Sequence, residues 1–422
     1  MGPEWVAIIG LIALFVVGTA VPINMGALGF VAAWMVGMWS LDMDEKDIVA
    51  GISGDLVLTL IGVTYLFAIA KKNGTIDLIV RVAVQAVRGR VALIPWVMFA
   101  ITAVLTAIGA VSPAACAIIG PIALGFAGRY GISPLMMGMF VVHGAQAGGF
   151  SPISIYGTIT NSVMEDAGLP TSELTVFFAS LAVNTLMAAI LFVVLGGRKL
   201  LSLRIDPAEA ADEEAEKHEG DDDHVRLDQV LTLLAFLATA VIALILDKNI
   251  GFVAITAAVA LSFMAPKRYQ DTVKQIAWPT VLLVAGVSCY AAILTEAGSP
   301  EFVGDWAAGL GVAAVGALVL CYVGGVVSAF ASSTALLPVI IPIAVPLIED
   351  GGISAALFVA ALAVSSTIVD VSPFSTNGAL MLANRPDSIS EPVYYRQILT
   401  YSVIVVLVGP LLVWAALVLP GW

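Results

Sequence analysis

The sequence predicts an all-α integral membrane protein with two inverted-topology repeats, and three observations support this. Of its 422 residues, 60% are hydrophobic and 12% are charged, whereas a soluble domain averages roughly 45–50% apolar and about 25% charged residues. Apolar runs recur that are long enough to cross a bilayer, whose core takes about 20 helical residues. Short motifs also recur 221 positions apart (372 − 151), such as "SPIS" at 151–154 and "SPFS" at 372–375.

The spanning helices follow from the apolar runs, five in each half of the chain. The opening "MGPEWVAIIGLIALFVVG" has no basic amino-terminal region and carries Glu4, so we expect a membrane helix there and not a cleaved signal. The predicted spans are 4–21, 23–40, 55–71, 134–163 (broken), 173–196, 227–246, 249–265, 279–295, 353–384 (broken) and 396–418. Amphipathic stretches at 76–90 and 300–310 are expected to lie along the membrane surface.

Two further apolar regions, 91–128 and 309–348, each form a helix pair that is pinched in the middle by "VSP" or "ASST". We expect re-entrant hairpins. The second arm of the first pair, 114–128, would rise about 22 Å, which is short of a core of about 30 Å. The turn also has no charged or aromatic anchor of the kind found at membrane interfaces. An ordinary hairpin that crosses twice is the alternative, because both forms return the chain to the same side.

The two halves form repeats joined by a linker. At the shift of 221, Ser112 falls on Ser333 and Gly157 on Gly378, and upstream the shift becomes 224. The predicted units are a first repeat at 1–196, with hairpin 91–128 and broken helix 134–163, a linker at 197–226, and a second repeat at 227–422, with hairpin 309–348 and broken helix 353–384.

The net charge of −13 comes mainly from the linker, where residues 206–223 hold ten acids and one lysine. The rest of the chain has 21 acids (31 − 10) and 17 bases (18 − 1). Such an acidic block cannot pack a core, so we expect a disordered, solvated linker. A regulatory or metal-buffering role through His218 and His224 is an alternative, and nothing in this charge balance indicates nucleic-acid binding.

The basic residues predict the orientation. With the amino terminus outside, 16 of the 18 lysines and arginines fall on the cytoplasmic side, and only Lys46 and Lys248 fall outside. Because five spans per repeat is an odd number, the repeats are inverted, which is typical of secondary transporters. We therefore expect a multi-pass protein of the cytoplasmic (inner) membrane, with both termini outside and the acidic linker in the cytoplasm.

Hydroxyl-rich motifs inside the apolar segments predict helix starts near mid-depth, because serine is a good N-cap and proline suits the first turn. A helix that starts in the membrane leaves free N–H groups that must face a ligand or a wet cavity. Two pairs of such ends predict an anion site between the halves. A simple Ser-Pro kink is the alternative for any one motif. The predicted substrate-binding residues are Ser112, Pro113, Ser151, Pro152, Ser154, Ser332, Ser333, Thr334, Ser372, Pro373, Ser375, Thr376 and Asn377.

No lysine or arginine is left for the interior, so a co-bound cation should help to neutralise an anionic substrate. Carbonyls at the ends of the half-helices predict a Na+ site beside the anion. The predicted cation-binding residues are Gly109, Ser112, Gly148, Gly149, Ser328, Ser333, Val369 and Asp370. Asp370 is the one deep carboxylate, and it fits a cation ligand, a proton carrier or a partner of freed backbone groups. His143 with Gln146 fits either polar packing or proton coupling.

The stretches "GVTYLFAIAKKNGTIDLIV" (62–80), "RGRVALIPWVMFAITAVLTAIGAVSPAA" (88–115) and "VVHGAQAGGFSPISIYG" (141–157) resemble the amino-terminal region of the malonate carrier (MatC-type) dicarboxylate permeases. The second half is more distantly similar to the ion-transporter superfamily of divalent-anion/sodium symporters. The resemblance implies an elevator-type carrier, usually a homodimer, that takes small dicarboxylates with Na+. Its site would lie between two re-entrant hairpin tips and two broken helices. The symporters carry Ser-Asn-Thr at these tips, where this chain has Val111-Ser112-Pro113 and Ser332-Ser333-Thr334.

The leading hypothesis is therefore secondary active transport of a small dicarboxylate such as malonate or succinate with Na+ or H+. A cation/proton antiporter or an oxyanion efflux carrier on the same scaffold is the alternative, with Asp370 as the exchanging acid. An enzyme is disfavoured, because no HExxH or GxSxG motif occurs and only Asp370 and His143 are chemically reactive groups within the spans. No cofactor is expected beyond the coupling ion, and a channel is also disfavoured.

Overall fold

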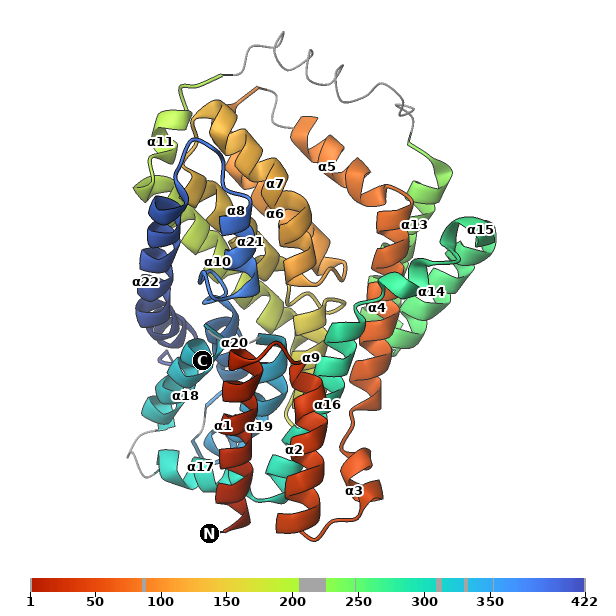
Figure 1. Ribbon diagram of the computed structural model, residues 1–422, viewed down its shortest axis with the longest axis vertical. Coiled ribbons are helices and arrows are strands. Elements are labelled where there is room, and N and C mark those ends of the chain that lie inside the picture. Colours follow the sequence, from red (N-terminus) through yellow and green to blue (C-terminus); the bar gives the residue numbers. More distant parts are fainter. Residues whose placement is uncertain are drawn as a thin grey trace.

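The computed structural model describes residues 2–85, 89–204, 225–246, 248–308, 313–329, 333–351 and 353–420, and these are helical apart from connections and one isolated bridge (Figure 1). The first half contains α1 (Pro3–Ala20), α2 (Met25–Ser40), α3 (Glu45–Ala50), α4 (Gly54–Lys72), α5 (Thr75–Gln85), α6 (Ile94–Ala107), α7 (Ser112–Tyr130), α8 (Pro134–Gly148), α9 (Ile155–Asp166), α10 (Glu173–Val194) and α11 (Gly197–Leu200). The second half contains α13 (Leu227–Leu246), α14 (Ile250–Met264), α15 (Pro266–Tyr269), α16 (Trp278–Glu296), α17 (Ser299–Ala308), α18 (Ala313–Ser328), α19 (Ser333–Gly351), α20 (Ala355–Thr367), α21 (Thr376–Ala383) and α22 (Glu391–Leu417). The predicted all-α class is confirmed.

The helices of the first half recur in the same order in the second. The pairs are α1 and α13, α2 and α14, α4 and α16, α5 and α17, α6 and α18, α7 and α19, α8 and α20, α9 and α21, and α10 and α22. Equivalent helices run in opposite directions: α1 starts at the lower end of the molecule in Figure 1, and α13 starts at the upper end. The predicted linker residues 205–224 lie outside the described residues.

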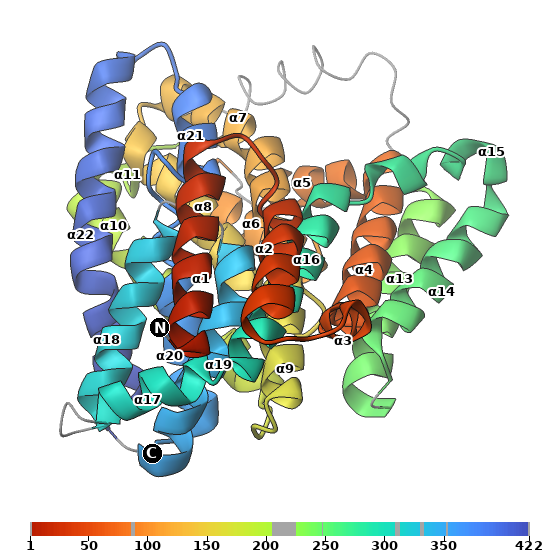
Figure 2. The ribbon, with the colours of Figure 1, turned by 60° about the horizontal axis from the view of Figure 1, so that its bottom comes forward.

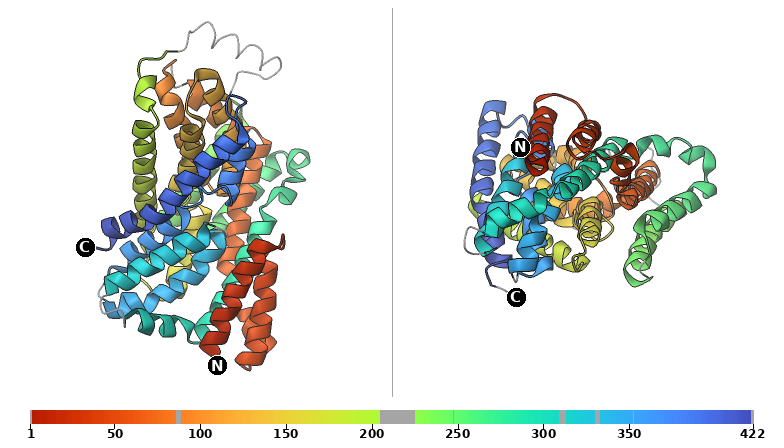
Figure 3. Two further views of the ribbon diagram at one scale, coloured as in Figure 1. Left: turned by 60° about the vertical axis from the view of Figure 1, so that its left-hand side comes forward. Right: turned by 90° about the horizontal axis from the view of Figure 1, so that it is seen from below.

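The two halves interlock through crossed pairs of helices. α2 packs along α16 of the other half, and α14 packs along α4. Glycines permit both approaches, because a Cβ on Gly26 would lie 1.9 Å from the Leu282 carbonyl oxygen and one on Gly62 would lie 2.5 Å from that of Gly251. Small residues allow such close contact between membrane helices. With α1 and α13, these helices form one group, from which α13 and α14 project at one side (Figures 2 and 3).

A second group contains α6 to α10 and α18 to α22, and its centre is formed by α8 and α20. Every residue of α8 from Leu135 to Gly148 is buried, and so is every residue of α20 from Phe358 to Thr367. A helix that is buried on all sides lies in the core of a large helical assembly. The two broken helices predicted from the sequence are these two, continued by α9 and α21 beyond each break.

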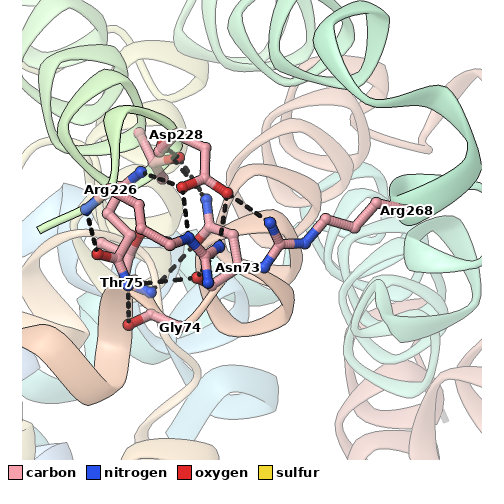
Figure 4. Close-up of polar contacts among 8 residues, drawn as sticks. Asn73, Gly74, Thr75, Arg226, Asp228 and Arg268 are labelled. Atoms are coloured by element: carbon pink, nitrogen blue, oxygen red, sulfur yellow. Dashed lines mark hydrogen bonds and ion pairs between the residues drawn. The ribbon is translucent and has the colours of Figure 1, made fainter. Parts of the chain in front are cut away.

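The surface helices α5 and α17 each follow a tight turn at a glycine with positive φ, Gly74 (φ 77°) or Gly298 (φ 71°). At the first turn a polar cluster ties α4, α13 and α15 together (Figure 4). Asp228 accepts hydrogen bonds from Arg226 at 2.7 Å and from Arg268 at 2.6 Å, and Arg226 also donates to the Asn73 carbonyl oxygen at 3.0 Å. The cluster lies at the end of the molecule where α13 starts (the linker end). Most of the basic residues were predicted on this side.

Some predicted boundaries differ from the structure. α7 has 19 residues and rises about 28 Å at 1.5 Å per residue. The prediction used only 15 residues, so the length argument against a full crossing was wrong. α22 begins five residues before the predicted 396. The short helices α3, α11 and α15 were not predicted, because four to six residues carry too little periodicity to stand out from loops.

Five of the described helices are long and apolar enough to cross a membrane: α4, α7, α10, α16 and α22. Eight shorter apolar helices, of 10 to 17 residues, accompany them.

Candidate substrate and cation site

The two helix breaks have the same local construction. α8 ends at Gly148 and α9 starts at Ile155, while α20 ends at Thr367 and α21 starts at Thr376. The N-caps are Ser154 and Ser375, whose hydroxyl oxygens accept from the N–H groups of Gly157 and Gly378, both at 3.3 Å. The predicted helix starts at the Ser-Pro pairs 151–152 and 372–373 were therefore wrong by about one turn, because the next serine makes the cap.

The Ser-Pro serines have other partners. Ser151 donates to the Ala107 carbonyl oxygen at the end of α6 (2.8 Å), and the Ser372 hydroxyl accepts from the Phe374 N–H (3.0 Å). In the first hairpin the N-cap of α7 is Val111, so Ser112 is the first helical residue and not the cap. Pro113 then occupies the first turn, where proline is favoured. Pro152 and Pro373 lie within the breaks, ahead of the helices they were predicted to start.

Several predicted cation ligands already accept hydrogen bonds inside the breaks. The Gly148 carbonyl oxygen accepts from the Ser151 N–H at 3.0 Å, and that of Gly149 accepts from Ser154 and from the Gly157 N–H. The Val369 carbonyl oxygen accepts from the Ser372 N–H at 3.3 Å. These bonds hold the breaks in shape. Ser332 lies outside the described residues.

Each break lies against the hairpin tip of the other half, where a tip means the turn between α6 and α7, or between α18 and α19, with the first residues of the helix that follows it. α9 packs against α19, and α21 packs against α7. Asn377 donates through Nδ2 to the Ser112 hydroxyl at 2.9 Å. The Tyr156 side chain, at the start of α9, lies close to Ser333 and Thr334 at the start of α19.

The sequence analysis missed Tyr156. The signal was present, because Tyr156 falls on Asn377 at the shift of 221 (156 + 221 = 377). Asn377 was predicted as a site residue, and its counterpart in the first half was overlooked because it is aromatic.

Asp370 lies in the second break within a cluster of oxygens. Its Oδ2 atom accepts from the Ser333 hydroxyl at 3.0 Å, and the same hydroxyl lies 2.7 Å from that of Ser328 and 3.2 Å from the Ser366 carbonyl oxygen. The Tyr156 side chain also lies close to the Asp370 carboxyl group. The structure thus brings together three predicted cation ligands, Ser328, Ser333 and Asp370, and adds two residues that were not predicted, Ser366 and Tyr156.

The interior carries little charge, as the sequence indicated. Among the residues whose burial is described, Asp370 is the only buried carboxylate and no lysine or arginine is buried. The described residues contain no group of three or more histidine, cysteine, aspartate or glutamate side chains placed to bind a metal ion. The cluster at Asp370 therefore presents one carboxylate among neutral oxygens.

A small hollow lies beside the first hairpin tip. Its lining residues are Thr106, Ala110, Val111, Ser112, Gly149, Ile155 and Tyr156. Its volume of about 10 Å³ has room for about one water molecule. A dicarboxylate does not fit this space, so a substrate bound here requires the tip to move. Gly109 marks that tip with a φ of 105°, and a Cβ there would lie 2.0 Å from the Val63 side chain of α4.

His143 is held by two side chains of neighbouring helices. Its Nδ1 atom lies 2.8 Å from Asn184 Oδ1, and its Nε2 atom lies 2.6 Å from the Tyr401 hydroxyl. The Asn184 amide donates its Nδ2 protons to Ser180, so its oxygen accepts the Nδ1 proton of His143. Nε2 is then the acceptor of the Tyr401 proton. This network joins α8, α10 and α22 and supports the polar packing role.

Comparisons with known proteins agree with this architecture. Residues 1–149 match the family model described as the dicarboxylate carrier protein MatC N-terminus, and residues 240–421 match the citrate transporter family model. The crystal structure of the Alcanivorax borkumensis YdaH transporter, described as having an unusual topology, is similar in fold with a TM-score of 0.59. At 15% sequence identity the similarity covers 87% of this chain and 86% of that one. No curated protein matches the sequence directly.

Inverted helices, paired breaks and these two family matches define the chain as a multi-pass membrane protein of the secondary transporter class, not an enzyme. Within that class, the resemblance to the MatC-type dicarboxylate permeases of the ion-transporter superfamily is confirmed.

Proposed function

We propose that the protein is a symporter that carries a small dicarboxylate, such as malonate or succinate, across the cytoplasmic membrane with Na+ or H+. The observation that carries this proposal is the crossed pairing of breaks and tips. Asn377 contacts Ser112 and Tyr156 contacts Ser333, so one central place receives polar groups from both halves. A site built from both halves can be exposed to one side or the other as the halves move relative to one another.

The substrate class rests on the family matches and on the composition of the site. The matched families carry dicarboxylates and citrate, and the site offers hydroxyl, amide and backbone groups without a buried lysine or arginine. Such a site neutralises an anion best when a cation binds beside it, and Asp370 with its neighbouring oxygens supplies the cation ligands. Hard cations prefer oxygen ligands of this kind.

The proposal extends to the architecture. We propose that the α6–α7 and α18–α19 pairs are re-entrant hairpins and that they move with α8 to α10 and α20 to α22 as one elevator body. The crossed group of α2, α4, α14 and α16 would remain fixed and hold a homodimer together. The basic residues at the linker end support a cytoplasmic location for that end, with both termini outside.

Uptake by purified protein in liposomes tests the proposal. Radiolabelled malonate, succinate and citrate would each be supplied under an inward Na+ gradient, an inward proton gradient or no gradient. We expect accumulation of at least one dicarboxylate under one gradient only, which identifies the coupling ion. Folded protein that accumulates none of the three under either gradient would contradict the proposal.

A cation/proton antiporter is the second candidate, and the single buried carboxylate favours it. An antiporter needs one acid that exchanges its proton for a cation, and Asp370 is the one such group among the described buried residues. Exchange of Na+ for protons without any dicarboxylate, abolished in Asp370→Asn, would favour this candidate.

A further inference from the structure

The two halves of the site differ at equivalent positions. The oxygens at the second tip come from Ser328, Ser333, Ser366 and Asp370. Subtracting 221 from each number gives Ala107, Ser112, Ala145 and Gly149. The Ser366 oxygen is a backbone carbonyl, which Ala145 also has, so the first half lacks only the carboxylate and the Ser328 hydroxyl.

The oxygen cluster at the second tip has too few protons for its contacts. The Ser333 hydroxyl approaches three oxygens, on Ser328, Ser366 and Asp370, but has one proton to donate. Even if Ser328 donates to Ser333, the contact with either the Ser366 carbonyl oxygen or an ionised Asp370 remains without a proton. A cation, or a proton on Asp370, removes this deficit. One carboxylate among neutral oxygens has the charge that matches a monovalent cation.

The first half has no room for a second carboxylate. A Cβ on Gly149 would lie 2.8 Å from Cδ2 of the Tyr156 ring, so the ring occupies the space that an aspartate would need. The Tyr156 side chain lies close to Asp370 of the second half instead. The negative charge of the site is therefore confined to the second half.

The first tip presents groups that can bind a carboxylate. Ser112 accepts from Asn377, so its own hydroxyl proton is available for another acceptor. α7 starts there without a side-chain cap, and this leaves the positive end of the helix open. The second amide atom of Asn377, a residue that is 1% exposed, has no partner among the described residues. Turning the amide about its last bond would free Nδ2 as a donor but would direct the Ser112 proton to Oδ1, so in either orientation the pair offers one donor to a ligand.

We propose that the two tips bind different ligands. A carboxylate group of the substrate binds at the first tip to Ser112, Asn377 and the start of α7, and the coupling cation binds at the second tip among Ser328, Ser333, Ser366 and Asp370. Tyr156 joins the two positions, because it lines the hollow at the first tip and lies close to Asp370 at the second. This inference rests on the proposed symport and adds which half binds which ion.

The matched variants Ser112→Ala and Ser333→Ala test the division. They remove the same atom at equivalent positions of the two repeats. We expect Ser112→Ala to raise the substrate KM about tenfold at saturating cation and to leave the cation half-saturation within about twofold. Ser333→Ala should raise the cation half-saturation about tenfold at saturating substrate and leave the substrate KM unchanged at saturating cation. Ser112→Thr and Ser333→Thr keep the hydroxyl and should restore both constants.

If both alanine variants shift both constants alike, the halves are equivalent and the division is wrong, while the proposed symport stands. A wild-type protein that shows no gradient-driven uptake contradicts the symport itself and the division with it. The cation would be whichever of Na+ or H+ drives wild-type uptake.

Tyr156→Phe tests the link between the tips. Binding of two ligands is coupled reciprocally, so the ratio of the substrate KM without cation to that with saturating cation measures the coupling. We expect this ratio to fall about tenfold in Tyr156→Phe. Tyr65→Phe is the control, because it loses a hydroxyl that contacts Ser262 away from the site, at 3.2 Å. An unchanged ratio in Tyr156→Phe would contradict the linking role.

Discussion

The two helix breaks have the same backbone plan and different chemistry. In both halves a serine caps the second half-helix, and a glycine packs against the carbonyl oxygen of the Ser-Pro serine. A Cβ added at Gly157 or at Gly378 would lie only 2.0 Å from that oxygen. The side chains at the site differ between the repeats. Gly149 is equivalent to Asp370, and Tyr156 is equivalent to Asn377. The comparison shows that residues which shape the breaks are kept between the repeats, whereas two of the side chains at the proposed ligand positions differ.

The largest effect is expected for Asp370→Asn. Removing the only buried carboxylate of the described residues takes away the charge that the second tip offers to a cation, and interactions with charged groups contribute about 1.5–3 kcal/mol. We expect gradient-driven uptake to fall about 100-fold, which corresponds to about 2.8 kcal/mol. The measurement is uptake into liposomes at fixed substrate and saturating coupling ion.

Asp271→Asn is the matched control for this change. Asp271 lies in the exposed connection before α16, where the hydrogen bond from Lys274 at 2.8 Å lowers the pKa of its carboxyl group. An exposed ion pair contributes little, so uptake should stay unchanged. Equal uptake by Asp370→Asn and wild type would show that the difference between the tips does not concern the cation.

Gly109→Ala is expected to have the next largest effect. The position combines a φ of 105° with a Cβ contact of 2.0 Å to Val63, so alanine is both strained and obstructed. Unfavourable backbone conformations cost about 1–3 kcal/mol each. We expect the free energy of unfolding to fall by about that amount. Uptake should also be lost, because the added methyl group would force the first tip away from α4.

Gly131→Ala introduces backbone strain without a steric clash, in the same helical hairpin, and so tests the two effects separately. Gly131 has a φ of 64° at the other end of α7, and no atom lies within 4 Å of its added Cβ. We expect a smaller stability loss of about 1 kcal/mol and normal uptake. If both variants behave alike, contact of the tip with α4 has no special role.

The turns before the two surface helices extend the comparison to the periphery. Asp228 falls on Glu4 at the shift of 224 (4 + 224 = 228). Asp228 binds two arginines with its carboxylate, whereas Glu4 accepts from Ser299 through its backbone oxygen at 3.2 Å. At equivalent positions, two ion pairs of Asp228 stabilise the turn before α5, and a hydrogen bond to the backbone oxygen of Glu4 stabilises the turn before α17.

Asp228→Asn should lower the free energy of unfolding by about 1 kcal/mol, because both arginines are partly exposed and such pairs are worth little more. Glu4→Gln keeps the backbone oxygen and should change stability by less than about 0.5 kcal/mol. Thermal unfolding in detergent at low and high salt measures both. The difference between the variants should shrink at high salt, because salt screens exposed charges. A difference that is independent of salt would contradict an ionic role.

The repeat and its helices could be predicted because both leave regular patterns in the sequence. Apolar runs marked the spanning helices, and matched registers such as Ser112 with Ser333 marked the equivalent tips. The caps were misplaced, because several serines lie close together in each break and only the chain geometry selects Ser154 and Ser375. Tyr156 could have been singled out as the counterpart of Asn377, but its place beside the other half could not be read from the pattern, nor could the contact of the Ser366 carbonyl oxygen with Ser333. Both depend on packing between residues far apart in sequence.

The smallest effect on transport is expected for Tyr401→Phe. The second half has valines, Val364 and Val405, at the positions equivalent to His143 and Asn184 (143 + 221 and 184 + 221), so this polar pair has no counterpart there. Loss of the Tyr401 proton leaves the buried Nε2 atom of His143 without a donor, which should cost about 1–2 kcal/mol of stability.

The pH profile of uptake should nevertheless stay unchanged, because His143 keeps its Nδ1 proton on Asn184 and only packs helices together. Tyr290→Phe is the control: it deletes the hydroxyl of another buried tyrosine, which donates to the Ala7 carbonyl oxygen at 2.7 Å, in the crossed helix group. Similar stability losses and identical pH profiles in the two variants would assign the His143 network to packing. A shifted profile in Tyr401→Phe alone would instead make His143 a proton carrier, and the first half would then contribute to ion coupling after all.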